Sequence, residues 1–132
     1  METIEEIRKT ALVGYTEHSD IELTRISEGH AEGRVAVKAH HLNPSGAVHG
    51  GIIFCLGDVI GGIACKTMDA LPVTVNSNIS YMRPMLGDKY IYTKADVIKK
   101  GKTTLFVDIR IYNEKMVETC RMNATYYNMA NR

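Results

Sequence analysis

The organisation of the chain centres on the segment His41-Leu42-Asn43-Pro44-Ser45-Gly46-Ala47-Val48-His49-Gly50-Gly51. This segment leads into an apolar run, Ile52 to about Met68, whose single carboxylate is Asp58. Apolar residues on every face of the run predict a buried helix. Free backbone N–H groups at a helix start attract developing negative charge, and a lone buried acid needs a partner or a use. Together these features predict acyl-transfer chemistry, with an oxyanion site, a polar orienting side chain and a carboxylate.

Length and composition bound the class of protein. The chain has 132 residues, enough for one domain with a sizeable core, and its charges nearly cancel to +1. This balance gives no support for nucleic acid or an anionic membrane as the main partner. The three scattered cysteines indicate reduced thiols, the acidic N-terminus is unlike a signal peptide, and no apolar run has transmembrane length. We therefore expect a soluble, cytoplasmic, single domain over residues 1–132.

The N-terminal part of the chain predicts a short helix followed by two strands. Thr3 and Glu6 have the spacing of a capping box, which predicts a helix over about residues 3–12. Ile21–Ser27 and Gly33–Lys38 have strand patterns, with the turn between them at Glu28-Gly29-His30.

After Pro72 the apolar pattern changes to a period of two, which is typical of strands. Four long strands are expected, at Val73–Met82, Lys89–Lys99, Thr103–Tyr112 and Met116–Tyr127. The short links between them favour antiparallel neighbours. The predicted fold class is therefore α+β, with one highly curved antiparallel sheet around one buried helix.

These residues resemble the hotdog-fold acyl-CoA thioesterases of the PaaI-like branch, named after phenylacetic acid degradation. The resemblance covers roughly Gly33 to the C-terminus. It rests on Asn43-x-x-Gly46-x-x-His49-Gly50-Gly51 with Asp58 eight positions after Gly50, on Val73-Thr74-Val75-Asn76-Ser77-Asn78-Ile79-Ser80-Tyr81-Met82-Arg83-Pro84, and on Lys99-Lys100-Gly101-Lys102-Thr103. It implies a central helix wrapped by five or six strands, homodimers that often pair into homotetramers, and hydrolysis of acyl-CoA thioesters without a metal or other cofactor.

The resemblance also implies roles for five residues. Gly50 would offer its backbone N–H to the thioester oxygen, and Asn43 would orient the carbonyl group or the attacking water. Asp58 would act as a general base or as a nucleophile. Thr74 would hold the water or the carboxylate, and His49 would support the oxyanion site without acting in proton transfer.

Helix geometry constrains how Gly50 and Asp58 can work together. If Gly50 begins the helix, eight residues at about 1.5 Å each place Asp58 about 12 Å further along the axis. A single thioester carbon needs its oxyanion donor and its base within roughly hydrogen-bond reach, or one water further. Either only one of the two residues is catalytic, or Gly50 of one subunit meets Asp58 of another. The second alternative predicts an obligate dimer with two shared sites.

Other polar and nucleophilic residues have weaker claims. Arg83, Lys100 and Lys102 are candidates for contacts with the phosphates of CoA, although Lys-Gly-Lys turns are usually solvated hairpin tips. No metal site is expected, because His40 and His41, as neighbours on a strand, would point to opposite faces. Cysteines in apolar segments are expected to fill the core rather than to act as nucleophiles.

Two alternatives to thioester hydrolysis remain open at this point. One is a hotdog module that binds acyl-CoA without catalysis, against which the retained Asp58 argues. The other is a hydratase or dehydratase on the same fold, which would use a catalytic His–acid pair in a motif that this sequence lacks. The sequence leaves the acyl group open between aromatic, short-chain and medium-chain types.

Overall fold

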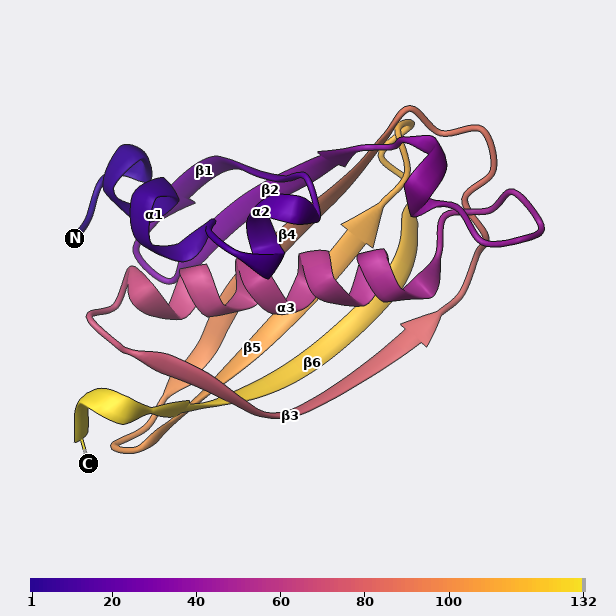
Figure 1. The fold of residues 1–132 in the computed structure, drawn as a ribbon. Helices are drawn as coiled ribbons and strands as arrows, with labels where there is room; N and C mark the ends of the chain where they lie inside the picture. Colours follow the sequence, from indigo (N-terminus) through magenta and orange to yellow (C-terminus); the bar gives the residue numbers. More distant parts are fainter. Residues whose placement is uncertain (132) are drawn as a thin grey trace.

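The structure, a computed structural model, describes residues 1–131, so the last position of the expected 1–132 domain lies outside it. A six-stranded sheet curves around the helix α3, Gly50–Lys66, which lies along its concave side (Figure 1). Two short helices, α1 (Ile4–Ala11) and α2 (Tyr15–His18), precede the first strand. Within residues 1–131, no helix has the length and hydropathy needed to cross a membrane.

All neighbouring strands of the sheet are antiparallel, in the order β1-β2-β4-β5-β6-β3. The strands are β1 (Ile21–Ser27), β2 (His30–Ala36), β3 (Pro72–Tyr81), β4 (Tyr90–Lys100), β5 (Thr104–Tyr112) and β6 (Glu118–Asn128). The chain places β3 at one edge of the sheet, next to β6, although it follows α3 directly. This crossover sets α3 beside an edge strand whose outer side has no partner strand among residues 1–131.

Close packing against the sheet explains two glycines of α3. A Cβ atom added to Gly57 would lie 2.7 Å from Met122 Sδ, and one added to Gly61 would lie 2.5 Å from the Tyr126 hydroxyl oxygen. Both positions therefore need glycine, despite its cost of about 1 kcal/mol each in helix propensity. Buried side chains such as Leu56 and Ile60 point the same way into the core.

The side of α3 that faces away from the core is only partly buried. The apolar residues on every face of the helix had predicted full burial. Half-buried residues follow one stripe of the helix: Cys55, Asp58, Val59, Gly62 and Lys66. The stripe carries the helix's acid and its C-terminal lysine, so its polar groups reach the surface of the single chain.

The expected curved antiparallel sheet around a central helix is confirmed, with six strands. β2 begins at His30 rather than Gly33, because His30 already pairs with Ser27 on β1 and Asp96 on β4. The pattern also misses α2 and two 3₁₀ turns, η1 (Ala39–His41) and η2 (Met129–Asn131). Such elements are too short to display a hydrophobic period.

Candidate functional site

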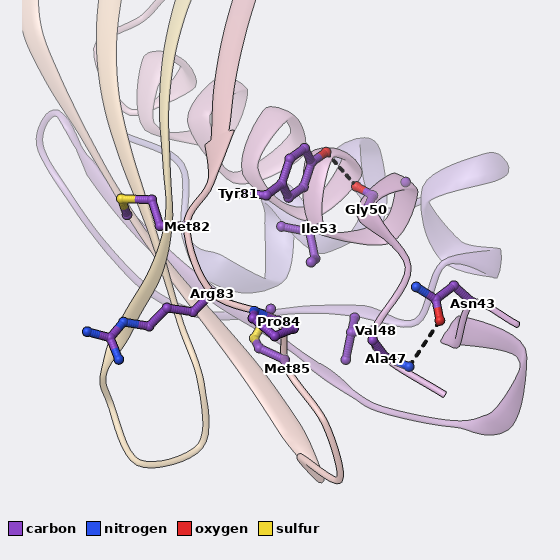
Figure 2. Close-up of a pocket in the computed structure, with 11 residues that line it drawn as sticks. Asn43, Ala47, Val48, Gly50, Ile53, Tyr81, Met82, Arg83, Pro84 and Met85 are labelled. Atoms are coloured by element: carbon purple, nitrogen blue, oxygen red, sulfur yellow. Dashed lines mark hydrogen bonds between the residues drawn. The ribbon is translucent and has the colours of Figure 1, made fainter. Parts of the chain in front are cut away.

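Of the cavities that border α3, two contain Gly50 and Asp58 separately. The larger, of about 550 Å³, lies at the start of the helix (Figure 2), and we call it the Gly50 cavity. Its lining residues are Asn43, Ala47, Val48, Gly50, Gly51, Ile53, Tyr81, Met82, Arg83, Pro84 and Met85. The other, of about 280 Å³, lies further along the helix and is called the Asp58 cavity. Its lining residues are Ala11, Thr16, Asp58, Val59, Gly62, Ile63, Lys66, Leu71, Pro72, Thr74 and Tyr126.

The side chain of Asn43 holds the loop before α3 in shape. Its Oδ1 accepts hydrogen bonds from the backbone N–H groups of Ser45 (2.9 Å) and Ala47 (3.1 Å), the second of which is drawn in Figure 2. Gly46 has φ +85°, a left-handed conformation that glycine adopts without strain. The side-chain carbonyl of Asn43 is therefore occupied, and only its amide group has hydrogen-bonding capacity left for a ligand.

The first residues of α3 leave one backbone donor available. His49 is the N-cap, and its Nδ1 accepts the N–H of Gly51 at 2.8 Å. The N–H of Gly50 has no hydrogen-bond partner among residues 1–131, as expected of an unpaired donor in a first helical turn. Tyr81 donates its hydroxyl to the Gly50 carbonyl at 2.9 Å and packs against the glycine, so this point of the helix is anchored to β3.

Asp58 is held by two hydroxyl groups. Thr74 Oγ1 donates to Asp58 Oδ1 at 2.7 Å, and the Tyr126 hydroxyl donates to the Asp58 backbone carbonyl, also at 2.7 Å. Tyr126 is only 2% exposed, and its burial, with the nearby Asp58 charge, raises the pKa of its phenol. The phenol therefore stays protonated and serves as a fixed donor, while Asp58 Oδ2 accepts no hydrogen bond from residues 1–131.

The basic residues proposed for CoA lie in different places. Arg83 lines the Gly50 cavity, with its guanidinium extending away from Gly50 in Figure 2. Lys100 is at the end of β4, where its ammonium donates to the Met68 carbonyl just beyond the C-terminus of α3. Lys102 is exposed in the turn between β4 and β5. Neither lysine lines the Gly50 cavity or the Asp58 cavity.

The thiols are poor candidates for nucleophiles. Burial raises the pKa of Cys65 to about 12 and also raises those of Cys55 and Cys120. The thiolate is the reactive form of cysteine, so these residues carry little of it at neutral pH.

His40 and His41 do not lie on a strand, so the reason given above for expecting no metal was wrong. The turn η1 brings the Nε2 atoms of both to Asp20 Oδ2, at 2.9 Å and 3.2 Å. However, the Lys38 N–H donates to His41 Nδ1 at 2.9 Å, so the neutral ring carries its proton on Nε2. A protonated Nε2 facing Asp20 offers no lone pair to a cation. Of the two histidines, His40 is hydrogen-bonded to Asp20, whereas the buried Nε2 of His41 lies near Asp20 Oδ2 without a hydrogen-bond partner among residues 1–131.

One chain thus brings together two groups of the predicted site residues but keeps the groups apart. Asn43, Gly50 and Arg83 line the Gly50 cavity, where His49 caps the helix. Asp58 and Thr74 line the other. Tyr81 and Tyr126 were not among the predicted site residues. Tyr126 is buried, in line with the alternation along β6, whereas Tyr81 at the end of β3 is 51% exposed. The hydrogen bond from Tyr81 to α3 depends on the position of β3 at the sheet edge.

Comparisons with known proteins identify the family of the chain. Residues 45–120 match the sequence profile of the Thioesterase superfamily. The chain is 35% identical to human acyl-coenzyme A thioesterase 13 over 71% of its own length and 69% of that protein's. It is 30% identical to acyl-coenzyme A thioesterase PaaI of Escherichia coli, over 72% of its own length and 68% of that protein's.

A solved structure gives the same result. A hypothetical thioesterase from Streptococcus pneumoniae, crystallised with coenzyme A, superposes with a TM-score of 0.77 at 28% identity, over 83% of this chain and 85% of that one. Mutant structures of that protein replace an aspartate and a threonine sixteen positions apart, which is the spacing of Asp58 and Thr74. The chain therefore belongs to the Thioesterase superfamily and has the hotdog fold of its PaaI-like members.

Proposed function

We propose that this chain hydrolyses acyl-CoA thioesters to a free acid and CoA, at a site that two subunits share. The main support for a shared site is that the free Gly50 N–H and the Asp58 carboxylate lie in different cavities of one chain. Membership of the Thioesterase superfamily and the likeness to a CoA-bound structure support the reaction and its substrate class.

The proposed chemistry uses few groups. A water molecule attacks the thioester carbon, and the Gly50 N–H stabilises the negative charge that develops on the carbonyl oxygen. Asp58 accepts a proton from the water, the C–S bond breaks, and CoA leaves as a thiolate, which needs little help from a general acid. Asn43 can donate its amide to the substrate or water, His49 keeps the first turn of α3 in place, and Thr74 orients the carboxylate.

Direct attack by Asp58 on the thioester is the other route open to the same geometry. In a single turnover in heavy-oxygen water, an unlabelled first acid would identify direct attack. That attack forms an anhydride between Asp58 and the acyl group, and its opening by water at Asp58 Cγ leaves an oxygen of the enzyme in the acid. Attack by water places the solvent label there instead.

Two hydrogen bonds between β3 and α3 support a dimer with a two-fold axis. Tyr81 on β3 contacts Gly50, and Thr74 on β3 contacts Asp58. A two-fold axis near Phe54, midway between Gly50 and Asp58, would exchange the two positions between antiparallel copies of α3. The midpoint of Thr74 and Tyr81 falls at Ser77–Asn78, so edge-to-edge pairing of β3 with its copy fits the same axis.

The exposed surface of β3 supports this homodimer. β3 is an edge strand with an unpaired outer side, and Val75 on it is 62% exposed. Long apolar edge strands are prone to pair with another strand. We further propose that dimers pair into a homotetramer, which is supported by the exposed Ile98 and Phe106. The free thiols of all three cysteines support a cytoplasmic location.

In this arrangement Arg83, at the rim of the Gly50 cavity, would contact a CoA phosphate. Lys100 and Lys102 lie beyond the far end of α3 from Gly50, so they would contribute to a phosphate site of the partner subunit's cavity. No metal or other cofactor is required for this chemistry.

The test is release of free thiol from a panel of acyl-CoA substrates by purified protein. Asp58→Asn should lower kcat by about 10²- to 10⁴-fold without changing the fold. Asp69→Asn is a matched control, because Asp69 is an exposed acid just beyond α3. Full turnover by Asp58→Asn would contradict the assigned mechanism, and acyl-CoA binding without thiol release would indicate a non-catalytic module.

A further inference from the structure

We propose that the Asp58 cavity holds the acyl group, and that Gly62 and Lys66 make it select acyl groups that end in a carboxylate or hydroxyl group. This inference rests on the proposed thioesterase function and names its substrate class. It assigns roles to two residues of the half-buried stripe of α3 that the reaction itself does not use.

The residues that line the Asp58 cavity follow α3 from Asp58 to Lys66, and we therefore treat the cavity as a channel along the helix. The α1–α2 region contributes Ala11 and Thr16, and the start of β3 contributes Leu71 and Pro72. The thioester carbon must lie near Asp58 for attack to occur, so an acyl group on this side runs from Asp58 along the helix. The channel walls on that path are mostly apolar, as a hydrocarbon chain requires.

Gly62 opens the wall of this channel. A Cβ atom added there would lie 3.6 Å from the Tyr126 ring and 3.9 Å from Pro72, which are ordinary contact distances. Alanine would thus fit the protein, and it is the better helix former. This position contrasts with Gly57 and Gly61, where packing alone demands glycine. The glycine at 62 is explained if the space beside it belongs to the substrate.

Lys66 closes the far end of the channel with a positive charge. Its side chain is only 19% exposed, and its ammonium donates to Thr10 Oγ1 at 3.3 Å. The carboxylate of Glu2 lies 3.8 Å away, an ion-pair distance that is beyond hydrogen-bond range. Because an ammonium has three N–H donors, Lys66 can bind an additional oxygen at the end of the channel.

The length of the channel limits the acyl group. Asp58 and Lys66 are eight residues apart on α3, or about 12 Å along its axis. Subtracting about 3 Å at each end for the contacts with the carboxylate and the ammonium leaves room for a chain of about six carbons.

The first experiment compares hexanoyl-CoA, its ω-hydroxy derivative and adipoyl-CoA, which differ only at the end of a six-carbon chain. We expect the wild-type kcat/KM to be roughly tenfold higher for adipoyl-CoA than for hexanoyl-CoA, with the hydroxy derivative between them. Lys66→Met should abolish this preference, whereas Lys9→Met, on the exposed side of α1, should keep it.

The outcomes separate this inference from the proposed function. If the wild type hydrolyses hexanoyl-CoA and adipoyl-CoA equally well, or if Lys66→Met keeps the preference, the role of Lys66 is wrong and the thioesterase function stands. If the wild type releases thiol from none of a broad acyl-CoA panel, the function and the inference both fail.

The second experiment tests the channel wall with Gly62→Ala. The added methyl group should lower the ratio of kcat/KM for hexanoyl-CoA to that for acetyl-CoA by roughly tenfold. The melting temperature should not fall, whereas that of Gly61→Ala should, because its Cβ would meet Tyr126 and Ile109 at 2.5 and 2.8 Å. A folded Gly62→Ala variant with an unchanged ratio would show that the acyl group lies elsewhere.

Discussion

The Thr74 hydroxyl donates a 2.7 Å hydrogen bond to Asp58 Oδ1 and thereby joins the start of β3 to the middle of α3. Thr74 lies beside an irregularity in the pairing of β3 with β6, between Thr74 and Asn76. The hydrogen bond leaves Asp58 Oδ2 as the carboxylate oxygen available to a water or a substrate. The acid that the sequence singles out is therefore oriented by a strand that follows it in the chain.

Replacing Thr74 should lower activity through this orientation. Thr74→Val removes the hydroxyl and keeps the shape, so kcat should fall roughly tenfold, the effect of one hydrogen bond to a charged group. Thr74→Ser keeps the donor and should remain close to wild type. The measurement is kcat and KM for thiol release, with thermal unfolding as the control. Equal kcat values for the two variants would show that the hydroxyl does not orient Asp58.

A second prediction concerns pH and lies away from the site. The His30 ring is 21% exposed, and its nitrogens lie 2.7 Å from Asp96 and 2.7 Å from Glu32. Burial alone would lower the pKa of His30, but the hydrogen bonds to Glu32 and Asp96 outweigh it and raise the pKa. The folded protein therefore favours the charged ring, which links β2 to β4.

Because the folded-state pKa is raised, the stabilisation by His30 is present at low pH and is lost as the pH rises through that pKa. The unfolding free energy of the wild type should thus exceed that of His30→Gln by more at about pH 6 than at about pH 9, which lie below and above the ordinary histidine pKa of about 6.5. Urea unfolding of both proteins measures this difference. A pH-independent difference would mean that the ring does not change charge between the folded and unfolded states.

Much of the fold could be predicted because its elements are long. The period-two pattern located β3 to β6 to within two residues, and the apolar run located α3. By contrast, α2 and η1 are each no longer than about one turn, so they have no period to detect. The placement of His40 and His41 around Asp20 followed from η1 and was therefore missed.

The site was predictable in its residues but less so in its contacts. Helix rise alone separated Gly50 from Asp58, and the structure places them in different cavities. The pairing of Asp58 with Thr74, and of Gly50 with Tyr81, depends on the position of β3 at the sheet edge. No local pattern encodes which strand flanks α3, because that is decided by the packing of the whole sheet.

The backbone donor of Gly50 can be tested by substitution. Gly50 is the first residue of α3, where proline is well tolerated, and His49 before it has φ −63° and ψ 135°, which suits a residue preceding proline. Gly50→Pro therefore removes the N–H and should lower kcat by about 10²- to 10³-fold. Gly50→Ala adds a comparable Cβ beside Tyr81 but keeps the N–H, so it is the matched control. Equal activities of the two variants would exclude this N–H as the oxyanion donor.

A site shared by two subunits predicts that two inactive variants recover activity when they are mixed, which a site within one chain does not. Gly50→Pro and Asp58→Asn should each be nearly inactive alone, because every dimer of either variant lacks one half of both sites. In a mixed dimer, Gly50 of the Asp58→Asn subunit faces Asp58 of the Gly50→Pro subunit, and one site is complete.

If the subunits reassort at random, about half of the dimers are mixed and one of the two sites in each is intact, which gives about a quarter of wild-type activity. The measurement is thiol release after the two variants are unfolded together and refolded, compared with each variant refolded alone. Two sites contained within single chains would give no recovery, because every chain in the mixture carries one defect. Recovery near a quarter, with a dimer mass in solution, would place Gly50 and Asp58 of different subunits on one thioester.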